Sequence, residues 1–582
     1  MADFRKWLLV VAVLVFAASA YGQVGSQFGC TANPGQPPIV RDGGLAELVG
    51  DVLLQCGGGD TGWVYVNFQI FMNTTVTSPI DSDMMTQAGL LVSYGATGTI
   101  WAGTPLQLVQ GQLQSNLTTG DDPTTRNSVL FAQAYVPTGT PTTIRLKNVR
   151  VVAPPASNTF VPTQILEFVS ASTAFGTTIP ITNPTQIVGY VEPGLTFSVS
   201  DCTGTDTPTA FSFQQCISQP LPLFKNGKYV VAGLKFKEGF PSAFKNIDEE
   251  SGGELCDNDV CVDDEATQGT RLIVSFTNIP AGVDLYVTDA NVNTAVNGFA
   301  YETAVLVPKA DASGAGGSSP IARPAVSADT KATCLDSELS ANWVKLSGTN
   351  SYSATWEVVA DNPLAADTYV FGVAVVYTAN TSAGLPALTT TPGKVMGTFA
   401  PISTVNSAVA IDKAPIPRFA LTPLTGNLAL TIMPCVTNLL FPYVTSTLSY
   451  DTGIAIVNTS LDNSGDDTPF ATDTQKGPCT VYFFGNLPIA PQVTPTVDSG
   501  SLVKFSMKQP LTGWPQLAGF EGYIIARCNF QYGHGYAFIV DGNLPGFGSE
   551  GYLALVIPDR VGVRPVDPFT TAGSGTGEQL VH

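Results

Sequence analysis

The densest cluster of chemically active groups in the sequence is acidic. Residues 248–265 read Asp-Glu-Glu-Ser-Gly-Gly-Glu-Leu-Cys-Asp-Asn-Asp-Val-Cys-Val-Asp-Asp-Glu, with nine carboxylates around two cysteines. Like charges at this density are costly unless water, salt or a cation screens them. Calcium takes about six to eight oxygen ligands, and the spacing here is not that of an EF-hand. The alternative is a solvated acidic loop. The candidate calcium ligands are Asp257, Asp259, Asp263, Asp264 and Glu265.

Groups for nucleophilic catalysis are scarce. The chain has two histidines, His534 and the terminal His582, and no Gly-x-Ser-x-Gly elbow. A Ser-His-Asp or Cys-His site would have to use His534. Because glycines flank this residue on both sides, we interpret it as a turn or strand histidine bonded to backbone. The sequence therefore predicts no enzyme and no cofactor other than the candidate calcium.

Carbohydrate chemistry is the alternative to a non-catalytic role. Glycoside hydrolysis needs two facing carboxylates, and Glu167 and Glu357 lie within strand patterns. Glu357 follows Trp356, a pair used by sugar sites, although a core Trp beside a solvent-facing Glu is the structural explanation. Sugar rings also stack on exposed aromatic rings. The aromatic residues near glycine-rich turns are Trp101, Trp514, Tyr532 and Tyr536.

The elements that would position these residues are strands. Short β-branched and aromatic runs such as 64–71, 143–152, 368–377 and 551–557 recur between Gly, Pro, Asn and Asp clusters. With 57 Gly and 42 Pro, the chain has little room for long helices. We predict an all-β protein of tandem antiparallel β-sandwich domains, Ig-like or jelly-roll-like, with few short helices.

The cysteines predict disulfides. All ten lie beyond residue 22, and an even number in an exported chain favours bridges. Zinc is less suited, because neither CxxC spacing nor histidine partners are present. Proximity in the sequence suggests three pairs, and strand context suggests a fourth. The two remaining cysteines form the fifth pair, although sequence alone does not determine the pairing. The predicted pairs are Cys30–Cys56, Cys202–Cys216, Cys256–Cys261, Cys334–Cys435 and Cys479–Cys528.

The start of the chain resembles an export signal. Arg5 and Lys6 precede an apolar run and small residues, so we predict a signal peptide over 1–22 that is too short to anchor the mature protein. Without it, 24 basic and 45 acidic residues remain. That charge disfavours nucleic acid and anionic membrane as partners. We expect a secreted, extracellular or cell-surface protein.

Proline clusters and low-complexity stretches suggest the domain limits. A Gly/Ser/Ala-rich stretch at 309–333 is predicted to be a flexible loop inside the middle region. The predicted regions are an N-terminal β-sandwich at 23–220, a middle β-sandwich at 221–410 with the acidic loop 248–265, a C-terminal β-sandwich at 411–558, and a disordered tail at 559–582.

Several motifs resemble a family of large, uncharacterised secreted proteins of environmental bacteria. Segment 37–56 is similar to the Cys, Pro-Pro, Val-Gly-Asp and Cys opening of that family. Segments 239–244 and 276–283 are similar to its middle part, and 439–444, 451–460 and 528–538 to its C-terminal module. The family has no assigned activity, so the resemblance implies export and β-sandwich folding and assigns no catalytic residue.

These observations favour a structural or adhesive role at the cell surface, with self-association through sheet edges or binding to surface glycans. A carbohydrate-binding protein is the alternative, and a glycoside hydrolase is the second alternative.

Overall fold

The computed structural model describes most of the chain from residue 27 to residue 557. The described residues are 27–94, 106–114, 126–156, 162–201, 204–206, 211–216, 218–221, 232–256, 261–293, 303–318, 322–333, 339–378, 391–403, 410, 414–426, 430–433, 435–461, 474–543 and 548–557. The predicted signal peptide 1–22 and tail 559–582 lie outside them, as do Trp101, Cys202, Asp257, Asp259, Cys334 and His582.

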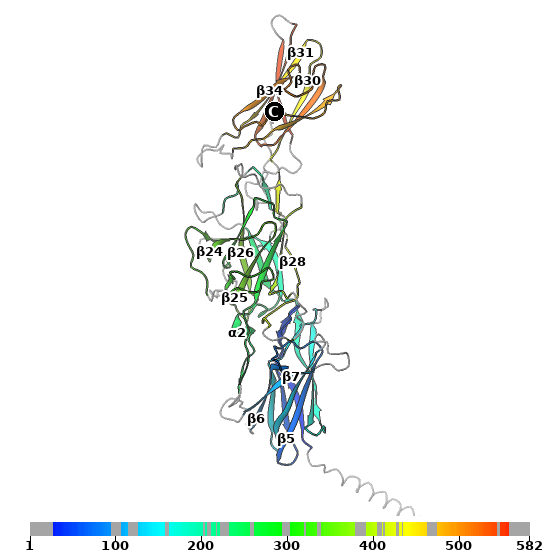
Figure 1. The fold of residues 1–582 in the computed structure, drawn as a ribbon, viewed down its shortest axis with the longest axis vertical. Coiled ribbons are helices and arrows are strands. Elements are labelled where there is room, and N and C mark those ends of the chain that lie inside the picture. Colours follow the sequence, from blue (N-terminus) through cyan, green and yellow to red (C-terminus); the bar gives the residue numbers. More distant parts are fainter. Residues whose placement is uncertain are drawn as a thin grey trace, which may run out of the picture.

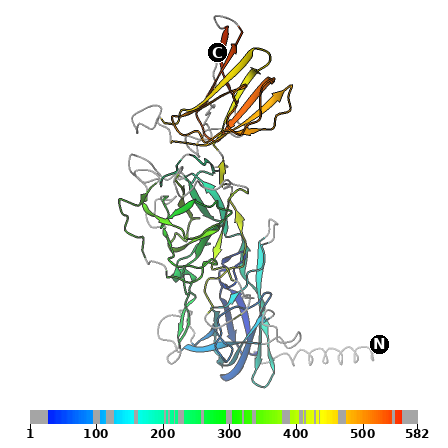
Figure 2. The same cartoon turned by 45° about the horizontal axis from the view of Figure 1, so that its top comes forward.

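The protein is all-β, as predicted, and it is elongated. Three groups of sheets, which we call the N-terminal, middle and C-terminal modules, follow one another along the long axis (Figure 1; Figure 2). Within the described residues the single helix is the four-residue α2 (Ile247–Glu250). Most strand pairs are antiparallel, and three short pairings are parallel.

The N-terminal module is one twelve-stranded sheet with a separate two-stranded ribbon, β10–β3. The large sheet folds over on itself, because one hydrophobic core collects inward residues from strands throughout its order. The strands are β1 (Gly29–Pro34), β2 (Ile39–Arg41), β3 (Glu47–Leu48), β4 (Val52–Gly57), β5 (Gly62–Met72), β6 (Met85–Tyr94), β7 (Leu106–Leu113), β8 (Ser128–Thr138), β9 (Thr142–Lys147), β10 (Arg150–Val151), β11 (Thr163–Thr173), β12 (Thr178–Ile179), β13 (Ile181–Thr182) and β14 (Thr185–Glu192).

Side-chain alternation explains how this sheet forms. Along β5, Val66, Phe68, Ile70 and Met72 are buried, while the residues between them face outward. A period of two places one set of side chains on each face of a strand. The inward set supplies the hydrophobic core, and the outward set remains available for contacts with other molecules.

The middle module packs two sheets, β15-β17-β26-β21-β24-β23 and β22-β25-β20-β27-β28, against each other. Trp356 is fully buried between them and stacks on Phe371 at 4.1 Å between ring centroids. Besides α2, the elements are β15 (Leu195–Ser200), β16 (Phe211–Gln214), β17 (Gly233–Glu238), β18 (Gly253–Cys256), β19 (Cys261–Asp264), β20 (Arg271–Thr277), β21 (Asp284–Thr288), β22 (Thr303–Leu306), β23 (Lys331–Ala332), β24 (Ala341–Lys345), β25 (Tyr352–Ala360), β26 (Thr368–Val376), β27 (Lys394–Ala400), β28 (Leu424–Thr425) and β29 (Leu430–Met433).

The C-terminal module is a sandwich of the sheets β33-β32-β35-β30-β38 and β34-β31-β36-β37 around one core. Its strands are β30 (Thr437–Thr445), β31 (Tyr450–Asn458), β32 (Cys479–Gly485), β33 (Gln492–Val493), β34 (Leu502–Ser506), β35 (Glu521–Cys528), β36 (Gly533–Asp541), β37 (Ser549–Leu553) and β38 (Leu555–Ile557).

Sheet membership differs from the predicted limits at 220 and 410. β15 and β16 precede residue 220 but pair with strands of the middle module, and β28 and β29 follow residue 410 and do the same. Strand pairing with partners far along the chain assigns a segment to a module, and proline clusters do not report such pairing.

Residues 309–333 were expected to form a flexible loop, but the first part of this stretch is anchored. The guanidinium of Arg271 donates to the carbonyl oxygens of Gly314 and Gly316, at 2.9 and 2.7 Å. The backbone N–H of Ile402 also donates to Ser313, at 2.7 Å. The composition indicated flexibility, but a buried arginine holds the segment against the sheet.

Four disulfides join described cysteines: Cys30–Cys56, Cys216–Cys435, Cys256–Cys261 and Cys479–Cys528. The expected pairs Cys202–Cys216 and Cys334–Cys435 are therefore wrong. β16 and β29 lie side by side as a parallel pair, which brings Cys216 and Cys435 together just beyond their ends. Proximity in the sequence predicted the wrong partners here, because the two bridged cysteines are 219 residues apart.

We expect peptide mapping of the unreduced mature protein to recover a linked Cys216–Cys435 peptide. The physical reason is that the paired strands β16 and β29 end beside each other, within reach of a bridge. Mass spectrometry after proteolysis at low pH, which suppresses exchange, is the measurement. A linked Cys202–Cys216 peptide would contradict the described pairing.

Candidate functional site

The acidic stretch folds into a clamp between two modules. It comprises α2 and the hairpin β18–β19, which reaches from the middle module along the side of the N-terminal module (Figure 1). Leu255 of the hairpin is buried against Gly89 of β6, where a Cβ atom would lie 2.6 Å from the Leu255 Cδ1 atom. Asn148 Nδ2 also donates to the Gly253 carbonyl oxygen, at 2.9 Å.

The described part of the hairpin does not bring its predicted calcium ligands, Asp263, Asp264 and Glu265, together. Asp263 is exposed, whereas Asp264 points to the opposite face, is fully buried and binds Arg150 at 2.8 Å. Successive residues of a strand face opposite sides, so Asp263 and Asp264 cannot ligate one ion. The calcium prediction is wrong for Asp264, and Glu265 is exposed beyond the strand.

A second acidic group near the hairpin tip is no metal centre either. The ligand atoms of Glu254, Cys256 and Cys261 lie within 4.8 Å of one another. However, the two sulfurs are bonded to each other. Metal binding by cysteine requires the thiolate form, which a disulfide lacks.

Arg41 is the centre of the junction between the N-terminal and middle modules. It ends β2 and is 1% exposed. Its guanidinium donates to both carboxylate oxygens of Glu250 at 2.6 and 3.0 Å, to Glu47 at 2.9 Å and to Thr270 at 2.9 Å. The planar fork of arginine suits such bidentate pairing. The contacts join β2 and β3 of one module to α2 and to Thr270, the residue before β20, of the next.

The electrostatics of this group favour the charged forms. Burial alone would lower the pKa of Arg41, but the charges of Glu250 and Glu47 outweigh burial and raise it. Burial would raise the pKa of Glu250, yet Arg41 and Lys245 hold it below its ordinary value. The ring of Phe419 lies 4.9 Å from the Arg41 guanidinium carbon and adds a cation–π contact. These shifts favour the ionised forms of Arg41 and Glu250 although both side chains are buried.

Arg150 forms a second buried pair beside the first. Its Nε donates to Asp264 at 2.8 Å, and its remaining nitrogens donate to the carbonyl oxygens of Ala46 and Glu250 at 3.1 and 2.6 Å. Arg418 also enters this junction, where burial and the nearby charge of Arg150 lower its pKa to about 10. The junction thus contains three buried arginines in a chain with a net charge of −20.

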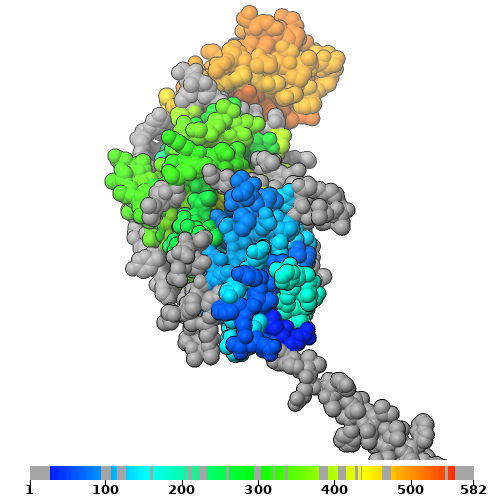
Figure 3. All heavy atoms as spheres, turned by 60° about the horizontal axis from the view of Figure 1, so that its bottom comes forward, coloured from blue at the N-terminus to red at the C-terminus, as the bar shows by residue number. Residues whose placement is uncertain are grey.

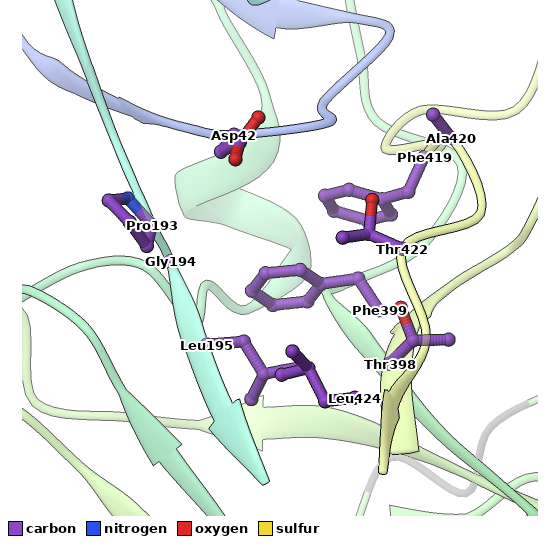
Figure 4. A pocket seen from close by; sticks show the side chains of 10 residues that line it. All are labelled: Asp42, Pro193, Gly194, Leu195, Thr398, Phe399, Phe419, Ala420, Thr422 and Leu424. Atoms are coloured by element: carbon purple, nitrogen blue, oxygen red, sulfur yellow. The ribbon is translucent and has the colours of Figure 1, made fainter. Parts of the chain in front are cut away.

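A third segment and a small cavity complete the junction. The carbonyl of Arg418 accepts from Leu45 at 2.9 Å, and Gly43 accepts from Ala420 at 2.8 Å. A cavity of about 110 Å³ lies between Asp42, the linker residues 193–194 and the stacked rings of Phe399 and Phe419 (Figure 4). Binding pockets for small ligands are usually several times larger. We interpret it as a packing gap of the junction.

The junction between the middle and C-terminal modules is built differently. The Cys216–Cys435 bridge and the β16–β29 ribbon connect the two parts. The side-chain amide of Gln531 donates to Gln214 at 2.5 Å across the junction. In Figure 3 the C-terminal module lies at the far end of the protein, beyond the middle module. Among the described residues, a covalent bridge and an amide contact connect the two modules here.

The predicted carbohydrate and catalytic residues are structural where they are described. Glu357 binds Arg271 at 2.9 Å and accepts from the Gly269 N–H. A solvent-facing glutamate was expected at this position, but the side chain is turned inward. The indole of Trp356 donates to the Thr288 carbonyl inside the core. His534 is half-buried on β36, opposite Val457.

The predicted aromatic platform is also dispersed. Trp514 packs on Phe505 at 4.9 Å and donates to the Val493 carbonyl, so it is largely part of the core. Tyr532 is half-buried in a left-handed conformation, and Tyr536 is exposed on β36, where it packs beside Phe538. These residues do not form one surface.

Glu167 has a buried carboxyl group inside the N-terminal module. It is 1% exposed, lies on β11 between the buried Ile165 and Val169, and its Oε1 atom has no hydrogen-bond partner among the described residues. Burial, with a smaller contribution from Asp51, raises its pKa to about 8. Glu167 is therefore protonated in the folded protein at neutral pH.

Sequence reasoning missed the junction arginines. Arg41 and Arg150 carry charge inside otherwise apolar strand patterns of a chain with only 26 basic residues. A basic residue in such a pattern is a signal of buried pairing, because an unpaired charge there would be very costly. Their partners Glu250 and Asp264 lie more than 100 residues away, and no sequence spacing indicates them.

Comparisons with known proteins assign no family. No family model matches the chain, and no curated protein matches it. Solved structures show distant likeness: "BspA_C_mut" (10% identity, 68% of this chain and 98% of that chain, TM-score 0.22) and "Biofilm associated protein - B domain" (8%, 68% and 86%, 0.17). A Streptomyces avermitilis alpha-L-rhamnosidase complexed with L-rhamnose also matches (11%, 91% and 41%, 0.14). These TM-scores are too low to assign a shared overall fold or a function.

Among the described residues, no helix has the length and hydrophobicity of a membrane span.

The junction predicts a large effect of Arg41→Met. Removing the cation leaves Glu250 and Glu47 buried without their partner, which costs about 3–5 kcal/mol. We expect the unfolding transition of the N-terminal and middle modules to move to lower temperature in differential scanning calorimetry. The control is Lys345→Met, because Lys345 binds Asp284 at the same 2.6 Å distance but on the exposed surface. There we expect a change within about 1 kcal/mol. Equal effects of the two substitutions would contradict the role of burial.

The buried Glu167 predicts a pH dependence of stability. The unfolded chain loses this proton near the ordinary pKa of 4.5, whereas the folded protein keeps it to about 8. The unfolded state thus binds fewer protons between these values, and stability falls as pH rises through the window. Glu167→Gln should remove that loss and stabilise the N-terminal module by about 2–4 kcal/mol at pH 8, with little change at pH 4.5. Calorimetry over pH 4.5–8.5 tests this, with exposed Glu550→Gln as the control. A Glu167→Gln variant that is less stable than the parent at pH 8 would refute it.

Proposed function

We propose that this protein is an extracellular, non-catalytic surface protein that acts as a stiff β-sandwich spacer and adhesive module. The observation that carries the proposal is the buried junction of Arg41 and Arg150 with Glu47, Glu250 and Asp264. Flexible links between domains are usually exposed and polar, and they rarely bury five charged groups. A junction of this kind fixes the relative orientation of two modules and transmits force between them.

Other features support an extracellular location. Eight of the described cysteines are paired, and disulfides persist in oxidising compartments. Charged residues make up only 12% of the chain, a composition that is common in extracellular β proteins. β37 is the last strand in the order of its sheet and offers an edge for strand addition between copies.

Carbohydrate binding is the second candidate function. It is favoured by exposed aromatic residues at Trp63, Tyr65, Phe71 and Phe168 on the N-terminal module, which differ from those expected from sequence. A glycan-binding face on an elongated protein is a consistent arrangement for an adhesin.

The spacer proposal predicts how the second junction responds to loss of its bridge. Cys216→Ser/Cys435→Ser should leave the modules folded but let the C-terminal module pivot, because the bridge is the covalent constraint at that junction. Small-angle X-ray scattering should show a stiff elongated particle for the parent and a broader distribution of maximum dimensions for the variant. Cys30→Ser/Cys56→Ser, whose bridge lies within one module, should not change the shape of the folded protein. A parent protein that already scatters as flexibly linked modules would overturn the proposal.

A further inference from the structure

The outward face of β5 carries an unusual sequence of side chains. Trp63, Tyr65, Asn67, Gln69 and Phe71 alternate with the buried residues of the strand and therefore lie in one row. Trp63 is 50% exposed and Tyr65 is 54% exposed. From Trp63 to Phe71 the row is about 26 Å long at the rise of an extended chain. We call this row, together with the outward residues opposite it on β8 and β11, the aromatic strip.

Aromatic rings lie at both ends of the aromatic strip. At one end, Tyr135 of β8 stacks on Trp63 at 4.4 Å with 3° between the ring planes, and it packs against Tyr65 at 4.9 Å with the rings tilted by 40°. At the other end, Phe71 packs beside Phe168 of β11 at 6.3 Å. The cross-strand contacts hold the rings in place, so a ligand that covers them would lose little side-chain freedom.

The middle of the strip is polar and uncharged. The carboxamides of Asn67 and Gln69 lie opposite Ser172 and Ser170 of β11. Asn67 is partly positioned already, because its Oδ1 atom accepts from the Gln133 N–H at 2.9 Å. Amide and hydroxyl groups both donate and accept hydrogen bonds, which suits a ligand that carries many hydroxyls.

Charge and topology narrow the choice of ligand. The strands β5, β8 and β11 contain one charged residue between them, Glu167, and it points into the core. A strip without Lys or Arg, in a chain of net charge −20, offers nothing to an anionic polymer and repels it at long range. β5 is paired on both sides, by β8 and β11, so another chain cannot add to it as a strand.

We propose that the aromatic strip is a binding site for an extended, uncharged β-linked polysaccharide. The sugar rings of such a chain present axial C–H faces that pack on the aromatic rings, while their equatorial hydroxyls reach Asn67, Gln69 and the two serines. Burial of C–H surface supplies the affinity, and the amide band orients the chain. The site gives the proposed adhesive role a ligand class, yet it does not depend on the stiffness of the junctions.

The test uses the mature full-length protein from residue 23. Its binding to microcrystalline cellulose and chitin is measured by depletion, and its binding to hydroxyethyl cellulose and a soluble β-1,3-glucan by affinity electrophoresis. We expect retention by at least one of these neutral glycans and none by alginate, an anionic polysaccharide. Trp63→Ala/Tyr65→Ala should weaken the retention at least tenfold, and Gln69→Ala should weaken it to a smaller extent.

The matched control is Phe484→Ala/Tyr523→Ala. These two exposed rings stack at 4.9 Å on the C-terminal module, so their removal deletes a similar aromatic pair elsewhere. We expect it to leave glycan binding unchanged, and unfolding temperatures show that each variant is folded. The proposal is overturned if the parent binds none of the neutral glycans, or if both double variants lose binding equally. It is also overturned if Trp63→Ala/Tyr65→Ala changes only the oligomeric state by light scattering. The scattering experiment on module stiffness is unaffected by any of these results.

Discussion

The pairing of buried arginines with carboxylates at the first junction is the constraint on which the shape of this protein depends. Arg41 and Arg150 belong to the N-terminal module, and Glu250 and Asp264 belong to the middle module. Each guanidinium is buried together with its carboxylate, so loss of either partner within the closed junction would leave an unpaired buried charge and be strongly destabilising. The two modules consequently act as one body, and the charges specify one orientation because a bidentate arginine pair tolerates little rotation.

The acidic segment illustrates how the same residues acquire a different role in the fold. As sequence it has nine carboxylates and invites interpretation as a calcium loop. In the structure Glu250 and Asp264 face the arginines, while Leu255 fills the space above Gly89 on β6. The segment is a clamp with an acidic outer side. Its small disulfide, Cys256–Cys261, closes the end of the hairpin and limits fraying of the two strands.

The outer faces of the sheets are where contact with other molecules can occur. Glu167, the charged residue of β5, β8 and β11, is turned inward and kept protonated by burial, which leaves the outer face of these strands neutral. The rings of Trp63, Tyr65 and Tyr135 support each other instead of collapsing into the core. In the proposed function, this neutral aromatic face on an acidic protein would combine long-range repulsion of anionic polymers with local attraction for neutral ones.

Local periodicity determined the fold class from the sequence alone. Strand runs such as 64–71 alternate apolar and polar residues, and this pattern depends only on neighbours in the chain. Disulfides between cysteines near in sequence or in strand context, such as Cys479 and Cys528, could be predicted for the same reason. Export and the signal peptide stay predictions from the sequence, since residues 1–26 lie outside the described part.

Contacts between residues that are far apart in the sequence were decided only by the tertiary structure. Cys216 meets Cys435, Arg41 meets Glu250, and Glu357 faces Arg271 instead of solvent. The pairing of Asp264 with Arg150 and the cross-strand stacking of Trp63 on Tyr135 depend likewise on which segments meet and in which register. Pairing partners of a strand are chosen by the burial of whole sheets, and no spacing within a single segment carries that information.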